Sequence, residues 1–310
     1  MNPLLSAMLS HADPSQVAGL ARFFKTGPGQ YGFGDQFLGI KVPVTRAVVR
    51  ECWKEVSFDD LEECICSEYH EVRLAALLTL VEIFKHAKRH STARPWNLAC
   101  HFDRTKRVEK SPSSFHGLSV ESLRSQCIDF YLSHTQYINN WDLVDLSCYP
   151  LLGEWLLDAP DRSLLYDLAR NGRTIWEQRI GIVSTMTFIR HGQLDDTFAI
   201  ADILLHHPHD LIHKAVGWLL REAGKRDKAR LEAFLQGPDP SVIPSEVTVM
   251  PDLIGHLYCH FDQAKRVEKS PSSFHGLSVE SPRYSTMPRT MLRYAIEKFP
   301  EPERQQYLAK

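Results

Sequence analysis

Apolar side chains recur with helical spacing along much of the chain. Residues 71–86 give the clearest case, because Val72, Ala75 and Leu80 fall on one face of a helix. The same spacing predicts helices over 126–137, 161–170, 174–190, 196–206, 211–224 and 288–299. Another helix is expected to begin near Asn139 or Asn140, since asparagine is a good N-cap and Asp142 follows in the first turn.

Strand patterns are scarce in the same regions. Helices of this length joined by short turns containing glycine or proline favour an all-α fold of stacked antiparallel helix pairs. We therefore expect an α-solenoid with a concave face, and a compact helical bundle is the alternative.

A nearly exact internal duplication interrupts this pattern. Residues 100–122 and 259–281 differ at only two positions, Arg104/Gln263 and Thr105/Ala264. Both copies contain proline and glycine and lack an apolar period, so we predict inserted loops at about 99–125 and 238–285 within a single domain, 1–310. Each copy holds a Cys-His pair and a later histidine, but the spacing matches no established zinc pattern. No metal site is predicted.

Composition excludes several classes of protein. The chain has 43% hydrophobic and 24% charged residues, which is typical of a soluble globular protein. No apolar run is long enough to span a membrane, and the start lacks the basic region of an export signal. Seven cysteines, an odd number, suit a reducing compartment. A net charge of -2 excludes a uniformly basic nucleic-acid binder but allows a locally basic surface.

One face of the predicted helix 211–224 is cationic. Lys214, Trp218, Arg221 and Lys225 fall at i, i+4, i+7 and i+11. A solvated helix face is the simpler interpretation. Residues 20–50 hold five further cations and only one anion, Asp35; the cations are Arg22, Lys25, Lys41, Arg46 and Arg50. Together these cations favour a ligand that carries phosphates.

Two other helices carry residues that suggest chemistry. Trp141 and Asp145 are one turn apart, so an indole and a carboxylate share a face. Arg179 lies among isoleucines and needs a partner, since an unpaired buried charge is costly. Asp145 or a phosphate could fill that role. Motifs for nucleotide binding, zinc proteolysis or serine hydrolysis are absent from suitable contexts.

The chain resembles the DNA alkylation repair family, the AlkD-like HEAT-repeat alkylpurine DNA glycosylases. The order and spacing of Trp141, Asp145, Arg179 and Trp218 match the active-site set of the family. The matching segments are FLGIKVPVTR (37–46), EVRLAALLTLV (71–81), CIDFYLSHTQYINNWDLVD (127–145), WEQRIGIV (176–183), HKAVGWLLRE (213–222) and MPRTMLRYAIEKF (287–299).

The resemblance implies a solenoid of HEAT-like helix pairs with a concave basic groove that holds double-stranded DNA. It also implies a monomeric, cofactor-free glycosylase that excises N3- or N7-alkylated purines in the bacterial cytoplasm or nucleoid. Asp145 would be the catalytic carboxylate, with Trp141, Trp218 and Arg179 beside it. The phosphate contacts would come from Arg22, Lys25, Lys41, Arg46, Lys214, Arg221 and Lys225.

Some choices stay open at this level. Phe23, Phe24 and Tyr31 are all candidates for an N-terminal aromatic that meets DNA. Two other functions are compatible with a helical scaffold: a non-catalytic binder of damaged or branched DNA, and a protein-interaction solenoid.

Overall fold

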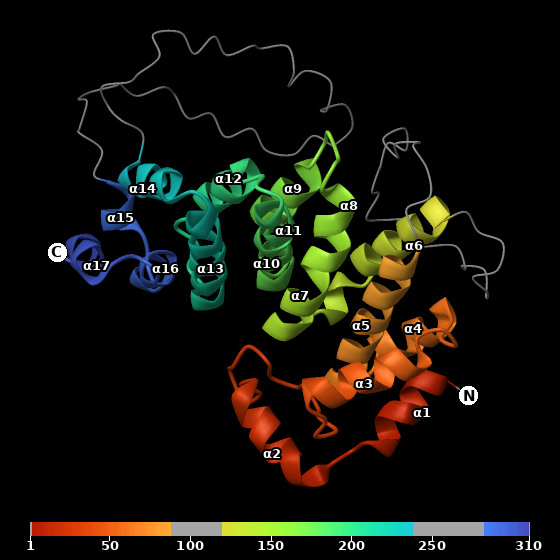
Figure 1. Ribbon diagram of the computed structural model, residues 1–310. Helices are drawn as coiled ribbons and strands as arrows, with labels where there is room; N and C mark the ends of the chain where they lie inside the picture. The colour runs from red at the N-terminus through yellow and green to blue at the C-terminus, as the bar shows by residue number, and fades with distance from the viewer. Residues whose placement is uncertain (1, 88–119, 238–281, 310) are drawn as a thin grey trace, which may run out of the picture.

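The computed structural model describes residues 2–87, 120–237 and 282–309 (Figure 1). Within these ranges the secondary structure is helical, and the one β-bridge, Gln36 to Tyr69, is isolated. The prediction of an all-α fold is confirmed. In the same ranges no helix has the length and apolar character that a membrane span requires.

The first half of the chain contains short helices around one long buried helix. The elements are α1 (Pro3–Ser10), α2 (Pro14–Phe23), α3 (Val42–Cys52), α4 (Phe58–Ile65), α5 (His70–His86), α6 (Val120–Ser133), η2 (Thr135–Tyr137), α7 (Trp141–Cys148), η3 (Tyr149–Gly153) and α8 (Glu154–Leu156). Helix α5 is buried along almost its whole length, which explains its near-continuous apolar sequence.

The second half continues the same alternation of helices and short turns. The elements are α9 (Ser163–Asn171), α10 (Ile175–Val183), α11 (Met186–Arg190), α12 (Asp195–Ile203), α13 (Asp210–Arg226), α14 (Lys228–Gln236), α15 (Arg283–Thr286), α16 (Arg289–Ala295) and α17 (Glu301–Leu308). Helices α5, α9, α12, α13 and α16 thus form where the apolar spacing predicts them.

The extent predicted for one helix was wrong. The single helix expected over 174–190 is two helices, α10 and α11. The Ser184 hydroxyl donates to the Ile180 carbonyl at 2.7 Å, and the Thr185 hydroxyl donates to Ile182 at the same distance. Such hydroxyls compete with the backbone bonds of a helix and bend or end it.

The predicted loops are also shorter than expected at their C-terminal ends. Residues 120–125 belong to α6, and α15 begins at Arg283. In both cases an arginine rests on a ring of the fold: the Arg124 guanidinium lies 3.8 Å from the Phe84 ring centre, and that of Arg283 lies 4.9 Å from Phe234. Most of both duplicated segments, with their cysteines and histidines, lies outside the described residues.

Helices far apart in sequence form a continuous row. Each of α3, α5, α7, α10, α13 and α16 contacts the next, and Figure 1 shows this row running from α3 to α16. Helices α4, α9, α12 and α14 pack against members of the row. The solenoid of HEAT-like pairs and its concave basic groove remain predictions.

A buried carboxylate fixes the loop before α3. Glu71 accepts hydrogen bonds from the N–H groups of Leu38, Gly39 and Ile40 at 3.0 to 3.1 Å. Gly39 has a φ of +86° and a Cβ there would lie 1.9 Å from the Asp13 carbonyl oxygen, so only glycine fits. The N-terminal segment is therefore attached firmly to α5.

Candidate active site

Helix α7 begins at a buried polar turn. Asn140 is the N-cap residue predicted from sequence, and its side chain accepts from the Trp141 N–H at 2.9 Å. Asp142 lies in the first turn and is buried. The cap sets where the helix starts, and it thereby places Trp141 and Asp145 one turn apart.

Asp145 and Arg179 form a bidentate ion pair between α7 and α10. The Arg179 Nε and Nη2 atoms donate to the two Asp145 carboxylate oxygens at 2.8 and 2.7 Å. The remaining Nη1 donates to the Leu211 carbonyl oxygen at the start of α13. One guanidinium therefore joins three neighbouring helices, and Asp145 is the partner that Arg179 requires.

The pair is only slightly exposed. The side chain of Arg179 is 6% exposed and that of Asp145 is 16% exposed. Burial raises the pKa of the Asp145 carboxyl above its ordinary value, while the charge and hydrogen bonds of Arg179 oppose that rise. A carboxylate in this setting is a better proton acceptor than one in water.

Aromatic side chains of the N-terminal segment surround Trp141. The Phe24 ring stacks on it at 5.7 Å between centres, and the Phe23 ring meets it edge-on at 5.8 Å. Its indole N–H donates to the Tyr31 hydroxyl oxygen. Phe24 is buried, Tyr31 is half-buried and Phe23 is 59% exposed, so Phe23 is the aromatic of the three that solvent reaches most.

Tyr31, one of the three N-terminal aromatic candidates from the sequence, lies next to Trp141 at the site. Burial raises the pKa of its phenol, and the Trp141 hydrogen bond acts in the opposite direction. The charges of Lys214 and Arg179 also lower the pKa of the phenol, so Tyr31 lies between the N-terminal segment and the cations of the site. The only signal in the sequence is an aromatic residue within a glycine-rich stretch.

The buried imidazole of His70 contacts the first turn of α7. His70 contacts Asp142 through Nε2 at 2.9 Å and Asp35 through Nδ1 at 3.1 Å. Burial is the strongest influence and lowers the pKa of His70, but the two carboxylates together raise it to about 9. Arg73 donates to the other Asp35 oxygen at 2.8 Å.

This network aligns the ring that supports Trp141. The Phe24 ring lies 4.6 Å from the His70 ring and also stacks on Trp141. A charged imidazolium, a phenyl ring and an indole thus follow one another from the core to the site. Sequence reasoning missed His70, whose partners are 35 and 72 residues away.

Trp218 occupies a different position from the ion pair. It is half-buried on α13, seven residues beyond Leu211, and it lines a cavity between α11 and α13. Trp141, Asp145 and Arg179 are linked by shared helices and contacts, whereas Trp218 is joined to them through α13. Its place in a catalytic set is a prediction.

The predicted cationic face of α13 is largely paired with carboxylates. Lys214 contacts Asp210 at 2.7 Å, Lys225 contacts Glu222 at 2.8 Å, and Arg221 pairs with both Glu222 and Glu297. This surface is therefore less positive than the spacing of its cations suggests. The N-terminal cations, Arg22, Lys25, Lys41 and Arg46, are exposed and form no ion pair with another described residue.

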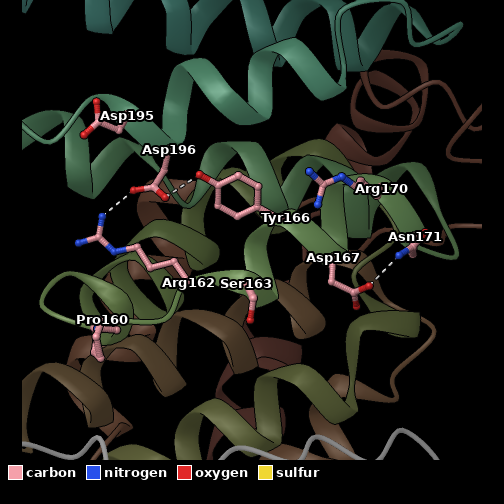
Figure 2. A pocket seen from close by; sticks show the side chains of 10 residues that line it. Pro160, Arg162, Ser163, Tyr166, Asp167, Arg170, Asn171, Asp195 and Asp196 are labelled. Atoms are coloured by element: carbon pink, nitrogen blue, oxygen red, sulfur yellow. Dashed lines mark hydrogen bonds and ion pairs between the residues drawn. The ribbon is translucent and has the colours of Figure 1, made fainter. Parts of the chain in front are cut away.

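A second cavity lies at α9 and α12, beside the turn that precedes α9. It has a volume of about 670 Å³ and is lined by residues of α9 and α12 (Figure 2). Arg162 and Tyr166 both bind Asp196, at 2.6 and 2.9 Å, and Asn171 binds Asp167 at 2.8 Å. Its charged groups all have partners, since Asp195 pairs with Arg230 and Arg170 lies over the Tyr166 ring, and we assign the cavity no function. No cluster of three metal-ligating side chains occurs among the residues that the structure describes.

These features define an all-helical protein in which a carboxylate–guanidinium pair lies beside an indole and several aromatic rings. Over residues 4–299 the chain matches the family model described as DNA alkylation repair enzyme, and it therefore belongs to that family. The resemblance inferred from the motifs is confirmed. Membership gives the protein a role in the repair of alkylated DNA, with DNA as its partner.

Comparisons with individual proteins add little detail. No curated protein matches the chain. One solved structure that it resembles is described as a predicted DNA alkylation repair enzyme from Enterococcus faecalis, with 16% sequence identity and a TM-score of 0.49. The alignment covers 72% of this chain and 88% of that one.

Proposed function

We propose that the protein is a monofunctional DNA glycosylase that excises cationic N3- and N7-alkylated purines, such as 3-methyladenine and 7-methylguanine. The observation that carries the proposal is the Asp145–Arg179 pair beside Trp141, in a member of a DNA alkylation repair family. The substrate is double-stranded DNA, and the protein acts as a monomer in the bacterial cytoplasm or nucleoid.

The reaction requires little acid catalysis. Alkylation makes the purine positively charged, so the bond between C1′ and N9 breaks with its electron pair going to N9, and the base leaves neutral. The deoxyribose then carries positive charge at C1′ and O4′. Water adds to C1′ and its proton passes to Asp145 and on to solvent, which leaves an abasic site. The hydrolysis consumes only water, so the proposal includes no cofactor.

The side chains have distinct roles in this scheme. Asp145 stabilises the positive sugar and accepts the proton of water, and its burial strengthens both effects. Arg179 is a positioning residue, because its two hydrogen bonds hold both carboxylate oxygens in one orientation. The indole faces of Trp141 and Trp218 attract a cationic sugar. The exposed N-terminal cations contact backbone phosphates.

A second candidate is a non-catalytic binder of damaged or branched DNA. One observation favours it: Arg179 already occupies both oxygens of Asp145, so the pair is electrically balanced and could serve only the fold. Tight binding of a damaged duplex without release of any base would select this function.

Base release from methylated duplex DNA separates the two candidates. We expect the wild type to release the alkylated base. The rate of release should fall about 100-fold or more in Asp145→Asn, because this change keeps the shape of the side chain but removes its negative charge. Asp195→Asn is the matched control, because Asp195 pairs with Arg230 on the surface. Equal release by the wild type and Asp145→Asn would remove the carboxylate from the mechanism.

A further inference from the structure

The cavity that Trp218 lines has an unusual charge balance. It has a volume of about 620 Å³ and lies between α11 and the C-terminal half of α13. Met186 and Ile189 give it an apolar wall. The other lining residues are Arg190, Trp218, Glu222, Lys225 and Arg226, which are three cations, one anion and an indole.

Two of these cations lack an anionic partner. Lys225 is bound to Glu222 at 2.8 Å, whereas Arg190 and Arg226 contact no carboxylate in the part of the chain that the structure describes. The Arg190 guanidinium lies over the Tyr149 ring at 4.7 Å, and Arg226 donates to the Arg190 carbonyl oxygen at 3.4 Å. The Arg226 side chain thus reaches the end of α11, next to Arg190.

The position of the cavity connects it with the candidate active site. Helix α11 directly follows α10, which carries Arg179, and Arg179 donates to Leu211 at the start of α13. The ion pair is therefore joined to the cavity in two ways, through the chain from α10 to α11 and through its contact with the start of α13. The cations predicted to grip DNA from α13, Lys214 and Arg221, are bound to carboxylates, which leaves Arg190 and Arg226 as the available guanidiniums near Trp218.

We infer that this cavity binds a backbone phosphodiester of duplex DNA, with Arg190 and Arg226 on the phosphate oxygens and Trp218 against the adjoining sugar or base. The choice of DNA as the ligand rests on the proposed function. Guanidinium groups suit phosphate because their N–H groups bind two oxygens at once, and a ring such as Tyr149 can support the flat guanidinium from behind. The indole supplies an apolar surface for the neighbouring deoxyribose.

The test compares two double variants that remove equal charge. Arg190→Gln/Arg226→Gln alters the cavity, and Lys54→Gln/Arg170→Gln is the control. Lys54 and Arg170 are exposed, and each lies 5.7 Å from an aromatic ring centre, over Trp53 and Tyr166. Affinity for a duplex with a non-cleavable abasic analogue is measured across a range of salt concentrations for the full-length chains. Base release is measured at saturating methylated duplex.

We expect the slope of log affinity against log salt to fall by about 2 in the cavity variant, since two phosphate contacts are lost. The control keeps the wild-type slope, and the cavity variant keeps the wild-type rate of release at saturation. A slope equal to that of the control would overturn the inference. So would slower release at saturation with an unchanged slope.

Two further comparisons separate the remaining explanations. Sodium phosphate at constant ionic strength should displace the duplex no better than chloride does. Stronger displacement that the cavity variant abolishes would assign the cavity to free phosphate and overturn the inference. Base release by the wild type tests only the proposed glycosylase activity. If the wild type releases base but the cavity variant keeps the wild-type salt slope, the inference about the cavity is overturned and the glycosylase is not. If the salt slope of the cavity variant falls but the wild type releases no base, the glycosylase is overturned and the inference about the cavity is not.

Discussion

Arg179 holds both carboxylate oxygens of Asp145, at 2.8 and 2.7 Å, and its third nitrogen binds the first turn of α13. The fork leaves neither residue free to rotate. A carboxylate fixed in this way keeps one orientation relative to Trp141, which lies one turn earlier on the same helix. Rigid placement of this kind is what stabilisation of a charged transition state requires.

The ion pair should show strong coupling in a double-mutant cycle. Arg179→Gln leaves a nearly buried carboxylate without its partner, and we expect a loss of about 3 kcal/mol in the free energy of unfolding. Asp145→Asn/Arg179→Gln should be more stable than the sum of the single changes predicts. Urea denaturation of the four proteins measures the coupling, and additive losses would contradict a direct pair.

His70 should make stability depend on pH. Its pKa of about 9 in the folded chain exceeds the ordinary value of 6.5, so the folded state binds the proton more tightly. The resulting stabilisation, on the order of 3 kcal/mol, is fully present below pH 6.5 and is lost as pH rises through 9. Thermal unfolding between pH 6 and pH 9.5 measures it. His70→Gln should flatten the profile, and a profile like that of the wild type would exclude His70 as its source.

Substitutions at Phe23 and Phe24 should have different effects on DNA binding and on the stability of the fold. Phe24 is buried between Trp141 and His70, so Phe24→Ala should cost about 3 kcal/mol or more. Phe23→Ala should cost less than about 1 kcal/mol, because the ring is mostly exposed. We expect Phe23→Ala to weaken binding of duplex DNA nonetheless. Unaltered affinity would show that the exposed ring does not contact the nucleic acid.

Lys25 should prove costly to the fold. It has a φ of +58°, and it is the one residue other than glycine with a positive φ in the described ranges. It follows the end of α2, a position at which glycine is usual. Lys25→Gly should therefore be about 1 kcal/mol more stable than Lys25→Ala. Both variants lose the same charge and should bind duplex DNA equally less well than the wild type, as urea denaturation and salt-dependent binding would show.

The sequence was most informative where local patterns decide the structure. Apolar spacing placed α5, α9, α12, α13 and α16, and the cap at Asn140 placed the start of α7. It also identified Arg179 as a buried cation in need of a partner and gave Asp145 as one of two choices. Helical spacing and charge compensation are local or nearly local rules, so a single sequence reveals them.

Long-range contacts were beyond that reasoning. The short helices α1 to α4 lie before the first range that the apolar spacing defines. Asp35, His70 and Asp142 come from three separate segments, and nothing in the pattern of each segment indicates the others. The cationic face of α13 was overestimated because Glu297 approaches Arg221 from the turn after α16, although Asp210 and Glu222 are close by in the sequence.

The contacts of Arg124 and Arg283 have a practical consequence for the duplicated segments. Each arginine returns the chain to a phenylalanine on the helix that it left, Phe84 of α5 and Phe234 of α14. Departure and return points are therefore neighbours, so a linker of a few residues could replace either segment without parting the helices. A shorter connection would also lower the entropic cost of closing the loop when the chain folds. We therefore expect a chain shortened at either segment to keep its described helices in place.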